Sequence, residues 1–500
     1  MGDHTVAYLK NVTLRVRDQL LLPNTNWQIE KGQHWAILGP NGAGKSTLVR
    51  ALTQDVAVVR GCISVLNDKS GRIHTGYVSF EQHQQLITRE DHRDESRFFS
   101  GKIDQGTTAY DMLIDGDSEL DCKIADADRF VNKLGIEPLL GKSLRALSNG
   151  EMRKVQIARV LINSPQILIL DEPFDGLDPV TRRDLTHLIN DLMDDSRAVI
   201  IVTHRQREIL PNITHVLGVK NGEVVFQGER KDILTPSRVE HLYNCEFATS
   251  LTLPPQTKPA SSAVRATNEV LVELQNVTVK YGDTIILDNV NWTMKSGENW
   301  VILGPNGSGK TTLLDVISGD NTQAYANEVY LFGRRRGSGE SIWDIKERIG
   351  IISAEFQIRY RKPITAFGTV LSGFFDSVGL YRNATLMQRD NAERCMEILG
   401  IADLADRKFN RLSYGQQRMV LLARSMVKMP MVLILDEPYQ GLDRANRRRI
   451  LDAIDVIGNR SGTHIIYVTH YPDELPVCMT HMLRFEKAIA GTYAMSQCRI

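Results

Sequence analysis

The feature that most constrains this chain is an internal repeat, in which related segments recur 265 residues apart. The string from Leu38 to Lys45 (LGPNGAGK) returns as Leu303 to Lys310 (LGPNGSGK), and Asn11-Val12-Thr13 returns as Asn276-Val277-Thr278. Solenoid and propeller repeats have periods of about 20 to 50 residues. The much longer period here indicates a duplicated domain, so we expect the chain to fold as two similar units.

The repeat divides the 500 residues into a first domain at 1–235, a linker at 236–268 and a second domain at 269–500. The middle part is rich in Pro, Ser, Thr and Ala, as in Lys258-Pro259-Ala260-Ser261-Ser262. This composition is typical of an extended, semi-flexible linker. We therefore expect neither a charged helix nor a core element there.

Short apolar runs alternate with helical patterns in each expected domain. Such runs are typical of buried strands in a parallel sheet. The expected strands cover 34–38, 166–170 and 198–202 in the first copy and 300–303, 432–435 and 464–468 in the second. Helices are expected at 44–53 and 152–162. This alternation predicts an α/β fold with a mainly parallel sheet and flanking helices.

Both copies carry a glycine-rich loop of the form G-x-x-x-x-G-K-[ST], after an apolar strand and before a helix. In such P-loops the backbone N–H groups surround phosphate oxygens, the lysine reaches the β and γ phosphates, and the hydroxyl ligates Mg²⁺. Two matches at the repeat offset make coincidence negligible. The expected ATP-binding residues are Gly39, Pro40, Asn41, Gly42, Ala43, Gly44, Lys45, Ser46 and Thr47, with Gly304, Pro305, Asn306, Gly307, Ser308, Gly309, Lys310, Thr311 and Thr312.

A pair of carboxylates ends one apolar strand in each copy, as Asp171-Glu172 and Asp436-Glu437. Side chains at the carboxyl ends of parallel strands face the ligand crevice. The aspartates, with Ser46 and Thr311, are therefore candidate Mg²⁺ ligands. The glutamates are candidate general bases that polarise the water attacking the γ phosphate.

Two short strings, Ser148-Asn149-Gly150-Glu151 and Ser413-Tyr414-Gly415-Gln416, precede the helical pattern that leads to each carboxylate pair. Taken alone, each is an N-cap serine with a glycine that permits close backbone approach. A Thr-His pair also ends a strand in each copy, at His204 and at His470.

The combination of P-loop, L-S-x-G-[QE] signature, Asp-Glu pair and Thr-His pair resembles the ATP-binding-cassette (ABC) ATPases. The resemblance covers both halves of the chain. It implies P-loop NTPase domains with an antiparallel β subdomain and a helical subdomain, ATP and Mg²⁺ as cofactors, and ATP hydrolysis. It also implies that the two cassettes face each other in cis and share two ATP sites, and that His204 and His470 act catalytically on the γ phosphate.

By this resemblance, one site would combine Lys45, Ser46, Asp171, Glu172 and His204 with Ser413, Gly415 and Gln416. The other would combine Lys310, Thr311, Asp436, Glu437 and His470 with Ser148, Gly150 and Glu151.

The two copies depart from the family pattern in different ways. Tyr281 stands where many cassettes place an aromatic residue under adenine, whereas the same offset puts Val16 in the first copy. Transporter cassettes carry a Mg²⁺-sensing Gln after G-[YF]-V-x, but Phe80 and Ala354 occupy those positions here. Gln82 and Gln357 are displaced substitutes for this Gln, which in transporter cassettes also contacts a membrane partner.

A narrower resemblance rests on the string from Leu331 to Lys346 (LFGRRRGSGESIWDIK) and on Ser372 to Ser377 (SGFFDS). These segments are similar to a bacterial tandem-cassette group called photorepair proteins or molybdenum-transport-associated ATP-binding proteins. The resemblance implies a cytoplasmic ATPase, peripheral on the inner membrane if it serves an ABC permease.

Composition limits the other function classes. Lys+Arg and Asp+Glu each number 60, so bulk charge does not attract nucleic acid. Six cysteines without a C-x-x-C pair predict no metal cluster, and no apolar run is long enough to span a membrane. The resemblances favour two functions: an ATPase linked to molybdate transport or photorepair, and a soluble mechanical ATPase acting on a ribosome or nucleic acid. The second is less favoured, because residues 236–268 offer no long charged helix. A binding module without turnover is a third alternative, which the presence of both Glu172 and Glu437 disfavours.

Two charged segments keep two interpretations each. Residues 88–97 (TREDHRDESR) suit a solvated loop or a partner contact. Arg334-Arg335-Arg336 suits a solvated turn or a phosphate contact.

Overall fold

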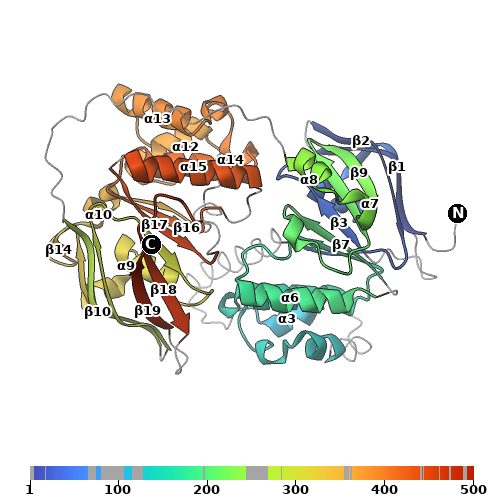
Figure 1. Cartoon of the computed structure of the whole chain (residues 1–500), viewed down its shortest axis with the longest axis horizontal. Helices are drawn as coiled ribbons and strands as arrows, with labels where there is room; N and C mark the ends of the chain where they lie inside the picture. Colours follow the sequence, from blue (N-terminus) through green and yellow to red (C-terminus); the bar gives the residue numbers. More distant parts are fainter. Residues whose placement is uncertain are drawn as a thin grey trace. The chain divides into compact units, whose positions relative to one another are not determined.

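A computed structural model shows how the chain folds. It describes residues 5–16, 19–65, 75–79, 106–114, 128–194, 197–243, 269–282, 284–353, 360, 363–439, 442, 444–460, 462–471, 475–487 and 493–500. The chain divides mainly into two compact units, one up to Cys245 and the other from Glu246 onward. Each unit is an α/β domain (Figure 1).

The first unit is built on a six-stranded sheet. Its order is β5 (Thr75–Ser79), β6 (Ile167–Asp171), β7 (Ala198–Thr203), β3 (Trp35–Leu38), β8 (His215–Lys220) and β9 (Glu223–Glu229). All neighbours are parallel except β8 and β9. An antiparallel sheet has the order β2 (Gln19–Glu30), β1 (Thr5–Val16) and β4 (Ala57–Val65). The helices are α1 (Lys45–Leu52), α3 (Ala109–Ile114), α5 (Asn149–Ile162), α6 (Pro179–Leu192), α7 (Arg230–Ile233) and α8 (Pro236–Tyr243).

The second unit repeats this topology. Its six-stranded sheet has the order β15 (Ile349–Ile352), β16 (Val432–Asp436), β17 (His464–Thr469), β12 (Trp300–Leu303), β18 (His481–Lys487) and β19 (Tyr493–Arg499). Its antiparallel sheet has the order β11 (Thr284–Lys295), β10 (Val270–Tyr281), β13 (Glu328–Leu331) and β14 (Arg334–Arg335). The helices are α9 (Lys310–Ser318), α10 (Ile342–Arg348), α12 (Ala366–Leu371), α13 (Leu386–Ile398), α14 (Tyr414–Met426) and α15 (Arg444–Arg460).

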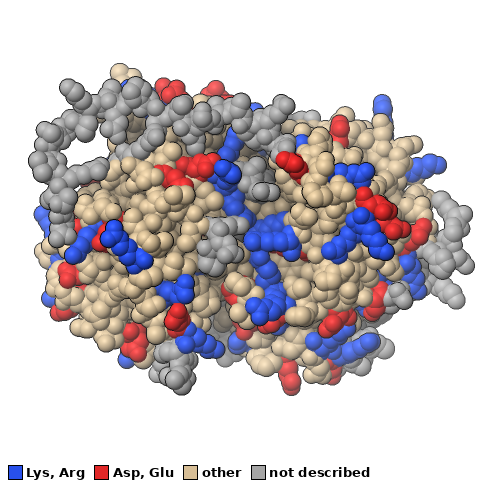
Figure 2. Space-filling model, in the orientation of Figure 1, with Lys and Arg blue, Asp and Glu red and all other residues tan. Residues whose placement is uncertain are grey.

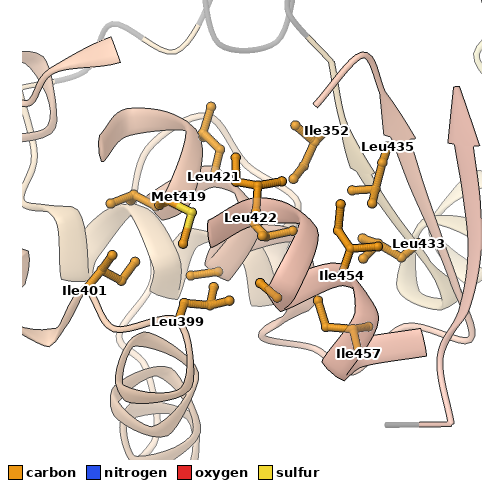
Figure 3. Packing of buried hydrophobic residues seen from close by; sticks show 14 of the residues in the cluster. Ile352, Leu399, Ile401, Met419, Leu421, Leu422, Leu433, Leu435, Ile454 and Ile457 are labelled. Carbon is orange, nitrogen blue, oxygen red and sulfur yellow. The ribbon is translucent and has the colours of Figure 1, made fainter. Parts of the chain in front are cut away.

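Alternate residues of the central strands pack on opposite faces of each sheet, as strand geometry requires. In the second unit Leu433 and Leu435 belong to a core with α12, α13, α14 and α15. Their neighbours Val432 and Ile434 belong to a second core with α9 and the antiparallel sheet. Figure 3 shows the first of these cores, with Leu421 and the other apolar residues of α14 lying among the surrounding elements. Both faces are covered, which explains why the strands are apolar throughout.

The structure confirms the predicted α/β class and the parallel strands, with small shifts of their ends. Strand β6 extends to Asp171 and β16 to Asp436, so each aspartate belongs to its strand. Helix α5 begins at Asn149, earlier than predicted, because Ser148 caps it.

The start of the predicted linker is helical, which corrects the expectation of an extended chain from residue 236. Helix α8 buries Val239 and Leu242, which lie three residues apart on one helix face. Leu242 is wholly buried in the core of the first unit, and Lys220 Nζ donates to the carbonyl of His241 at 2.6 Å. Packing against the domain therefore overrides the linker-like composition.

Among the described residues, no helix is both long and apolar enough to cross a bilayer. Basic and acidic side chains both occur on the face drawn in Figure 2, in keeping with the equal numbers of the two.

Candidate functional site

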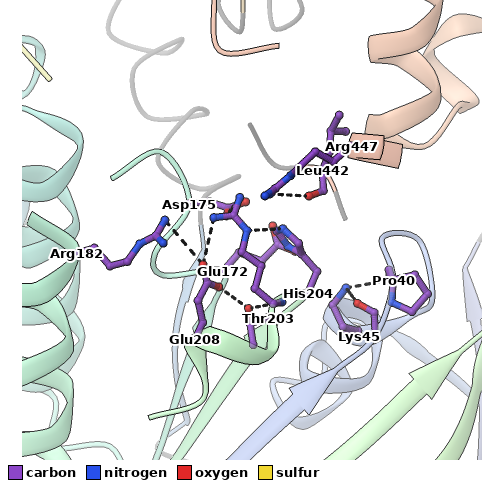
Figure 4. Close-up of polar contacts among 12 residues, drawn as sticks. Pro40, Lys45, Glu172, Asp175, Arg182, Thr203, His204, Glu208, Leu442 and Arg447 are labelled. Carbon is purple, nitrogen blue, oxygen red and sulfur yellow. Dashed lines mark hydrogen bonds and ion pairs between the residues drawn. The ribbon is translucent and has the colours of Figure 1, made fainter. Parts of the chain in front are cut away.

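The two P-loops have the same local structure. Lys45 Nζ donates to the carbonyl oxygens of Gly39 at 3.0 Å and Pro40 at 2.9 Å, and Figure 4 shows the lysine turned toward its own loop. Lys310 Nζ makes the corresponding bonds, at 2.8 Å and 2.7 Å, to Gly304 and Pro305. Each buried ammonium group thus lies inside its loop, at the start of a helix that favours anions.

Glycine is required by geometry at several loop positions. Gly44 and Gly309 precede α1 and α9 with φ of 101° and 93°, which side chains rarely adopt. A Cβ added to Gly39 would lie 2.0 Å from the carbonyl oxygen of Val219. The loop therefore keeps its backbone exposed for phosphate because no side chain fits.

Asp171 is the buried carboxylate at the end of β6. Its Oδ2 accepts a hydrogen bond from the Tyr77 hydroxyl of β5 at 2.8 Å. Burial raises the pKa of Asp171, and the Ser46 and Tyr77 hydroxyls and the Lys45 ammonium oppose that rise. The predicted pair Ser46 and Asp171 is thus brought together, from the P-loop and from a strand 125 residues further along.

Asp436 occupies the same position in the second copy. Burial, and then the neighbouring charge of Glu437, raise the pKa of Asp436 to about 7, while Lys310 lowers it. The second copy has Ile351 where the first has Tyr77. The carboxylate therefore receives no tyrosine hydroxyl from that strand position.

The candidate bases adopt an unusual backbone conformation. Glu172 has φ of 50° and Glu437 has φ of 45°. Each amide nonetheless donates to the next strand, to Val202 O at 2.9 Å and Val468 O at 3.0 Å. Positive φ in a residue with a side chain is uncommon and clusters at functional sites. Its presence in both copies supports the assignment of these glutamates.

Both predicted histidines lie against their glutamates. His204 Nδ1 is 3.3 Å from Glu172 Oε1, and His470 Nδ1 is 2.6 Å from Glu437 Oε1. Burial lowers the pKa of His204 to about 4. The same burial raises the pKa of Glu172 to about 7.

Arg205 adds a feature to the first copy that the sequence did not predict. Its Nε donates to His204 Nε2 at 3.0 Å, and its other nitrogens approach Glu208 Oε1 at 3.3 Å and Asp175 Oδ1 at 3.6 Å. Figure 4 shows Arg205's partners Asp175, His204 and Glu208 grouped together. The second copy has Tyr471 in place of Arg205.

The signature serines act as helix caps. Ser148 Oγ accepts from the Glu151 amide at 3.3 Å, and the Glu151 side chain accepts from the Ser148 amide at 2.8 Å. Ser413 and Gln416 form the same capping box. The signature glycines pack closely, since a Cβ on Gly150 would meet Thr181 at 2.2 Å and one on Gly415 would meet Asn446 at 2.8 Å.

Sequence reasoning missed a buried arginine in each signature helix. Arg418 donates to the carbonyl oxygens of Ser353, Asp436, Glu437 and Pro438 at 3.0, 3.2, 2.7 and 2.9 Å. It thereby fixes the backbone turn that carries the candidate carboxylates Asp436 and Glu437. Arg153 is the buried counterpart in the first copy. The available signal was an arginine at the repeat offset, five residues after each signature serine.

The remaining predicted features have different outcomes. Tyr281 ends β10 with 54% of its surface exposed, and its hydroxyl accepts from Asn321 at 3.0 Å. Val16 ends β1 and is also exposed. Gln82, Gln357 and residues 88–97 lie outside the described residues.

Of the three arginines at 334–336, only Arg336 is buried. Arg336 is buried, pairs with Glu340 at 3.1 Å and lies over the ring of Tyr325 at 4.8 Å. Arg334 and Arg335 form β14 and are exposed. Arg336 therefore stabilises the turn of the antiparallel sheet, and only the other two remain open to solvent.

The fold and the two P-loops define a P-loop nucleotide hydrolase with two copies of its nucleotide-binding domain. The ABC transporter family model matches twice, at residues 22–175 and 287–440. These matches cover more than half of the chain, so the chain belongs to the ABC ATPase family, as the sequence motifs predicted. It is an ATPase with two ABC domains.

Relatives of similar length share the tandem arrangement. The ABC transporter ATP-binding protein ModF of Escherichia coli is 37% identical over 479 residues, 95% of each chain. An uncharacterized ABC transporter ATP-binding protein of Schizosaccharomyces pombe is 28% identical over 92% of this chain and 93% of its own.

Solved structures of tandem ABC proteins share the fold. The chain described in a model of ribosome-bound archaeal Pelota and ABCE1 aligns with a TM-score of 0.61 at 20% identity, covering 98% of this chain and 78% of that one. RNase-L inhibitor aligns with a TM-score of 0.57 at 18% identity, over 97% and 90%.

Proposed function

We propose that each copy binds ATP with Mg²⁺ and that the two copies form two composite sites in cis. The main support is that the set of P-loop, Asp-Glu pair, histidine and capped signature is intact in both copies. Each P-loop would meet the signature of the other copy, so Ser148, Gly150 and Glu151 would serve the second copy, and Ser413, Gly415 and Gln416 the first.

The carboxylate environment fits a divalent cation. Asp436 and Glu437 are adjacent, and burial raises the pKa of Asp436 to about 7. A cation bound by Asp436 and Thr311 would relieve this desolvation and repulsion. Ser46 and Asp171 offer the same oxygen ligands in the first copy, and oxygen ligands are the ones that Mg²⁺ prefers. When bound, Mg²⁺ would neutralise charge on the β and γ phosphates.

The chain's own residues divide the work of hydrolysis. Lys45 and Lys310 would exchange their loop carbonyls for phosphate oxygens, and the P-loop amides would hold the β phosphate. Glu172 and Glu437 would orient the attacking water and accept its proton. His204 and His470, held by these glutamates, would lie beside the γ phosphate.

For the physiological role, we propose an ATPase that acts with an ABC permease at the inner membrane, in molybdate transport or a photorepair-type process. The support is the 37% identity to ModF, which is described as an ABC transporter ATP-binding protein. A cytoplasmic location, peripheral on the membrane, belongs to the same proposal.

A second candidate is a soluble mechanical ATPase acting on the ribosome or on nucleic acid. One sequence observation favours it: Phe80 and Ala354 replace the Gln of transporter cassettes that contacts a membrane partner. The structural similarity to ribosome-bound proteins is a similarity of fold and does not choose between the two roles.

Affinity purification at native expression separates these roles. The bait is the Glu172→Gln, Glu437→Gln chain, which we expect to retain ATP, and the control is the Lys45→Ala, Lys310→Ala chain. A permease recovered with the first bait and lost with the control would support the transport role. Ribosomal components or nucleic acid recovered in this pattern would overturn it in favour of the second candidate.

A further inference from the structure

The histidines of the two copies differ in what their second ring nitrogen contacts. His470 Nε2 is buried and has no hydrogen-bond partner among the residues that the structure describes. His204 Nε2 instead accepts a hydrogen bond from Arg205 Nε at 3.0 Å. In both copies Nδ1 faces the glutamate, so Nε2 is the nitrogen left to meet a ligand.

The Arg205 contact fixes the role of each nitrogen in His204. Arginine is always protonated and only donates, so Nε2 of His204 must be an acceptor. A neutral imidazole then carries its proton on Nδ1 and donates it to Glu172. In this arrangement His204 has no free N–H for a γ phosphate, and its lone pair is already occupied. Contact with phosphate therefore requires that Arg205 be displaced.

Displacement of Arg205 is opposed by two carboxylates. Glu208 and Asp175 approach separate nitrogens of the guanidinium, and their side chains are only 3% and 1% exposed. Glu208 is held in turn by the Thr203 hydroxyl and by Arg182 at 3.9 Å. The contact with Glu208 is a charge-assisted hydrogen bond, which is stronger than a bond between neutral groups, and the contact with Asp175 is an ion pair at 3.6 Å. Two buried carboxylates thus hold Arg205 against His204.

The second copy has other residues at both positions of the Arg205–Asp175 ion pair. Gln440 stands at the position of Asp175, and Tyr471 at that of Arg205. The Tyr471 ring lies 3.9 Å from the His470 ring, centroid to centroid, and leaves Nε2 without a partner in the described part of the chain. Asp175 and Arg205, which form an ion pair in the first copy, are thus both replaced in the second copy. This joint replacement is expected if the function of the pair is to restrain the histidine.

We propose that Arg205 is a positioning residue that holds His204 back from ATP and makes the first copy the slower site of hydrolysis. This inference rests on the proposed function, in which each copy hydrolyses ATP with its own glutamate and histidine. Arg205 is not assigned a direct contact with phosphate, because its three guanidinium nitrogens are already engaged by His204, Glu208 and Asp175.

The test measures ATP turnover by the first copy in the full chain carrying Glu437→Gln, which removes the base of the second copy. In this background, Arg205→Tyr, the residue of the second copy, should raise kcat about tenfold and change KM less than threefold. Arg205→Met removes the donor without adding a ring and should also raise kcat. A gain in kcat distinguishes the proposal from a purely structural role, which can only lower activity.

Two further variants sharpen the comparison. Arg183→Met removes an exposed cation of α6 that makes none of the contacts described above with His204, Glu208 or Asp175, so it should not raise kcat. The reverse exchange, Gln440→Asp with Tyr471→Arg in a Glu172→Gln background, should lower second-copy kcat about tenfold.

The inference would be overturned if both folded Arg205 variants bind ATP but show unchanged or lower kcat. The same holds if first-copy turnover stays at the level of the Glu172→Gln, Glu437→Gln chain whether or not Arg205 is present. Wild-type turnover in the Glu172→Gln, Glu437→Gln chain would instead contradict the proposed function itself. The glutamates would then not be the bases, and the inference about Arg205 would fall with that proposal.

Discussion

The imidazole Nδ1 of His470 lies 2.6 Å from Oε1 of Glu437, which precedes it by 33 residues along the chain. His204 and Glu172 make the same contact at 3.3 Å in the first copy. The glutamate in each pair has positive φ and its amide bonds to the strand that leads to the histidine. Each proposed base is therefore oriented by its backbone and by an imidazole, as a group that is to act on one water molecule requires.

Removing both bases should stop hydrolysis while ATP remains bound. In the Glu172→Gln, Glu437→Gln chain the amide oxygens can still accept from the histidines, but neither side chain can take a proton from water. We expect turnover to fall about 100-fold or more, in line with the usual contribution of general base catalysis. The measurement is ATP hydrolysis beside binding of a fluorescent ATP analogue. Wild-type-like turnover would show that the glutamates are not the bases.

Burial of Glu172 predicts a pH-dependent cost in stability. Its pKa rises from the ordinary 4.5 to about 7 in the folded chain, so its contribution to stability is present below about pH 4.5 and is lost as pH rises through 7. Glu172→Gln does not ionise and avoids that loss. Without nucleotide, the variant should therefore exceed the wild type by about 1–3 kcal/mol at pH 8 and match it near pH 4.5.

Thermal unfolding at the two pH values measures this effect, with the wild type compared at each pH so that His204 and other groups cancel. An equal Tm difference at both values would contradict the assigned pKa. A lower Tm of the variant at pH 8 would contradict it as well.

Tyr281 should strengthen ATP binding at the second copy alone. Stacking of adenine on its exposed ring is worth about 1–3 kcal/mol by analogy with base–aromatic stacking, so Tyr281→Ala should weaken binding about 5- to 150-fold. Tyr281→Phe keeps the ring, loses only the bond from Asn321, and should bind nearly as the wild type does. Val16→Ala is the matched change in the first copy and should matter little.

Titration of chains with one P-loop lysine replaced by alanine separates the two affinities. Equal affinities that Tyr281→Ala does not change would show that Tyr281 is only a strand residue.

Arg418 should be essential to the turn that carries Asp436 and Glu437. Arg418→Met leaves four carbonyl groups without this donor, and a hydrogen bond that involves a charged group is worth about 1.5–3 kcal/mol. Arg448→Met in α15 is the matched control, because the Arg448 side chain is 84% exposed. Denaturant unfolding should show a large loss for the first and little change for the second. Similar stability of both variants would contradict the proposed role of Arg418 in holding this turn.

The sequence by itself was sufficient for the duplication, the P-loops, the carboxylate pairs and the α/β class. These features are encoded locally, because a phosphate loop needs contiguous glycines and a strand buried on both faces needs a continuous apolar run. The repeat offset of 265 residues then related each motif of the first copy to its counterpart in the second. The histidines were predicted as site residues through the family resemblance, and the structure places each beside its glutamate.

Only the tertiary structure decided which side chains contact the candidate catalytic groups. The contacts of Arg205 with His204 and of Tyr77 with Asp171 depend on strand pairing and side-chain direction, which no single stretch of sequence specifies. Helix α8 is another example, because its residues have a linker-like composition. The helix forms where Leu242 is buried in the core of the first unit. Burial and long-range pairing set the energies of these groups, and both arise only when distant segments pack together.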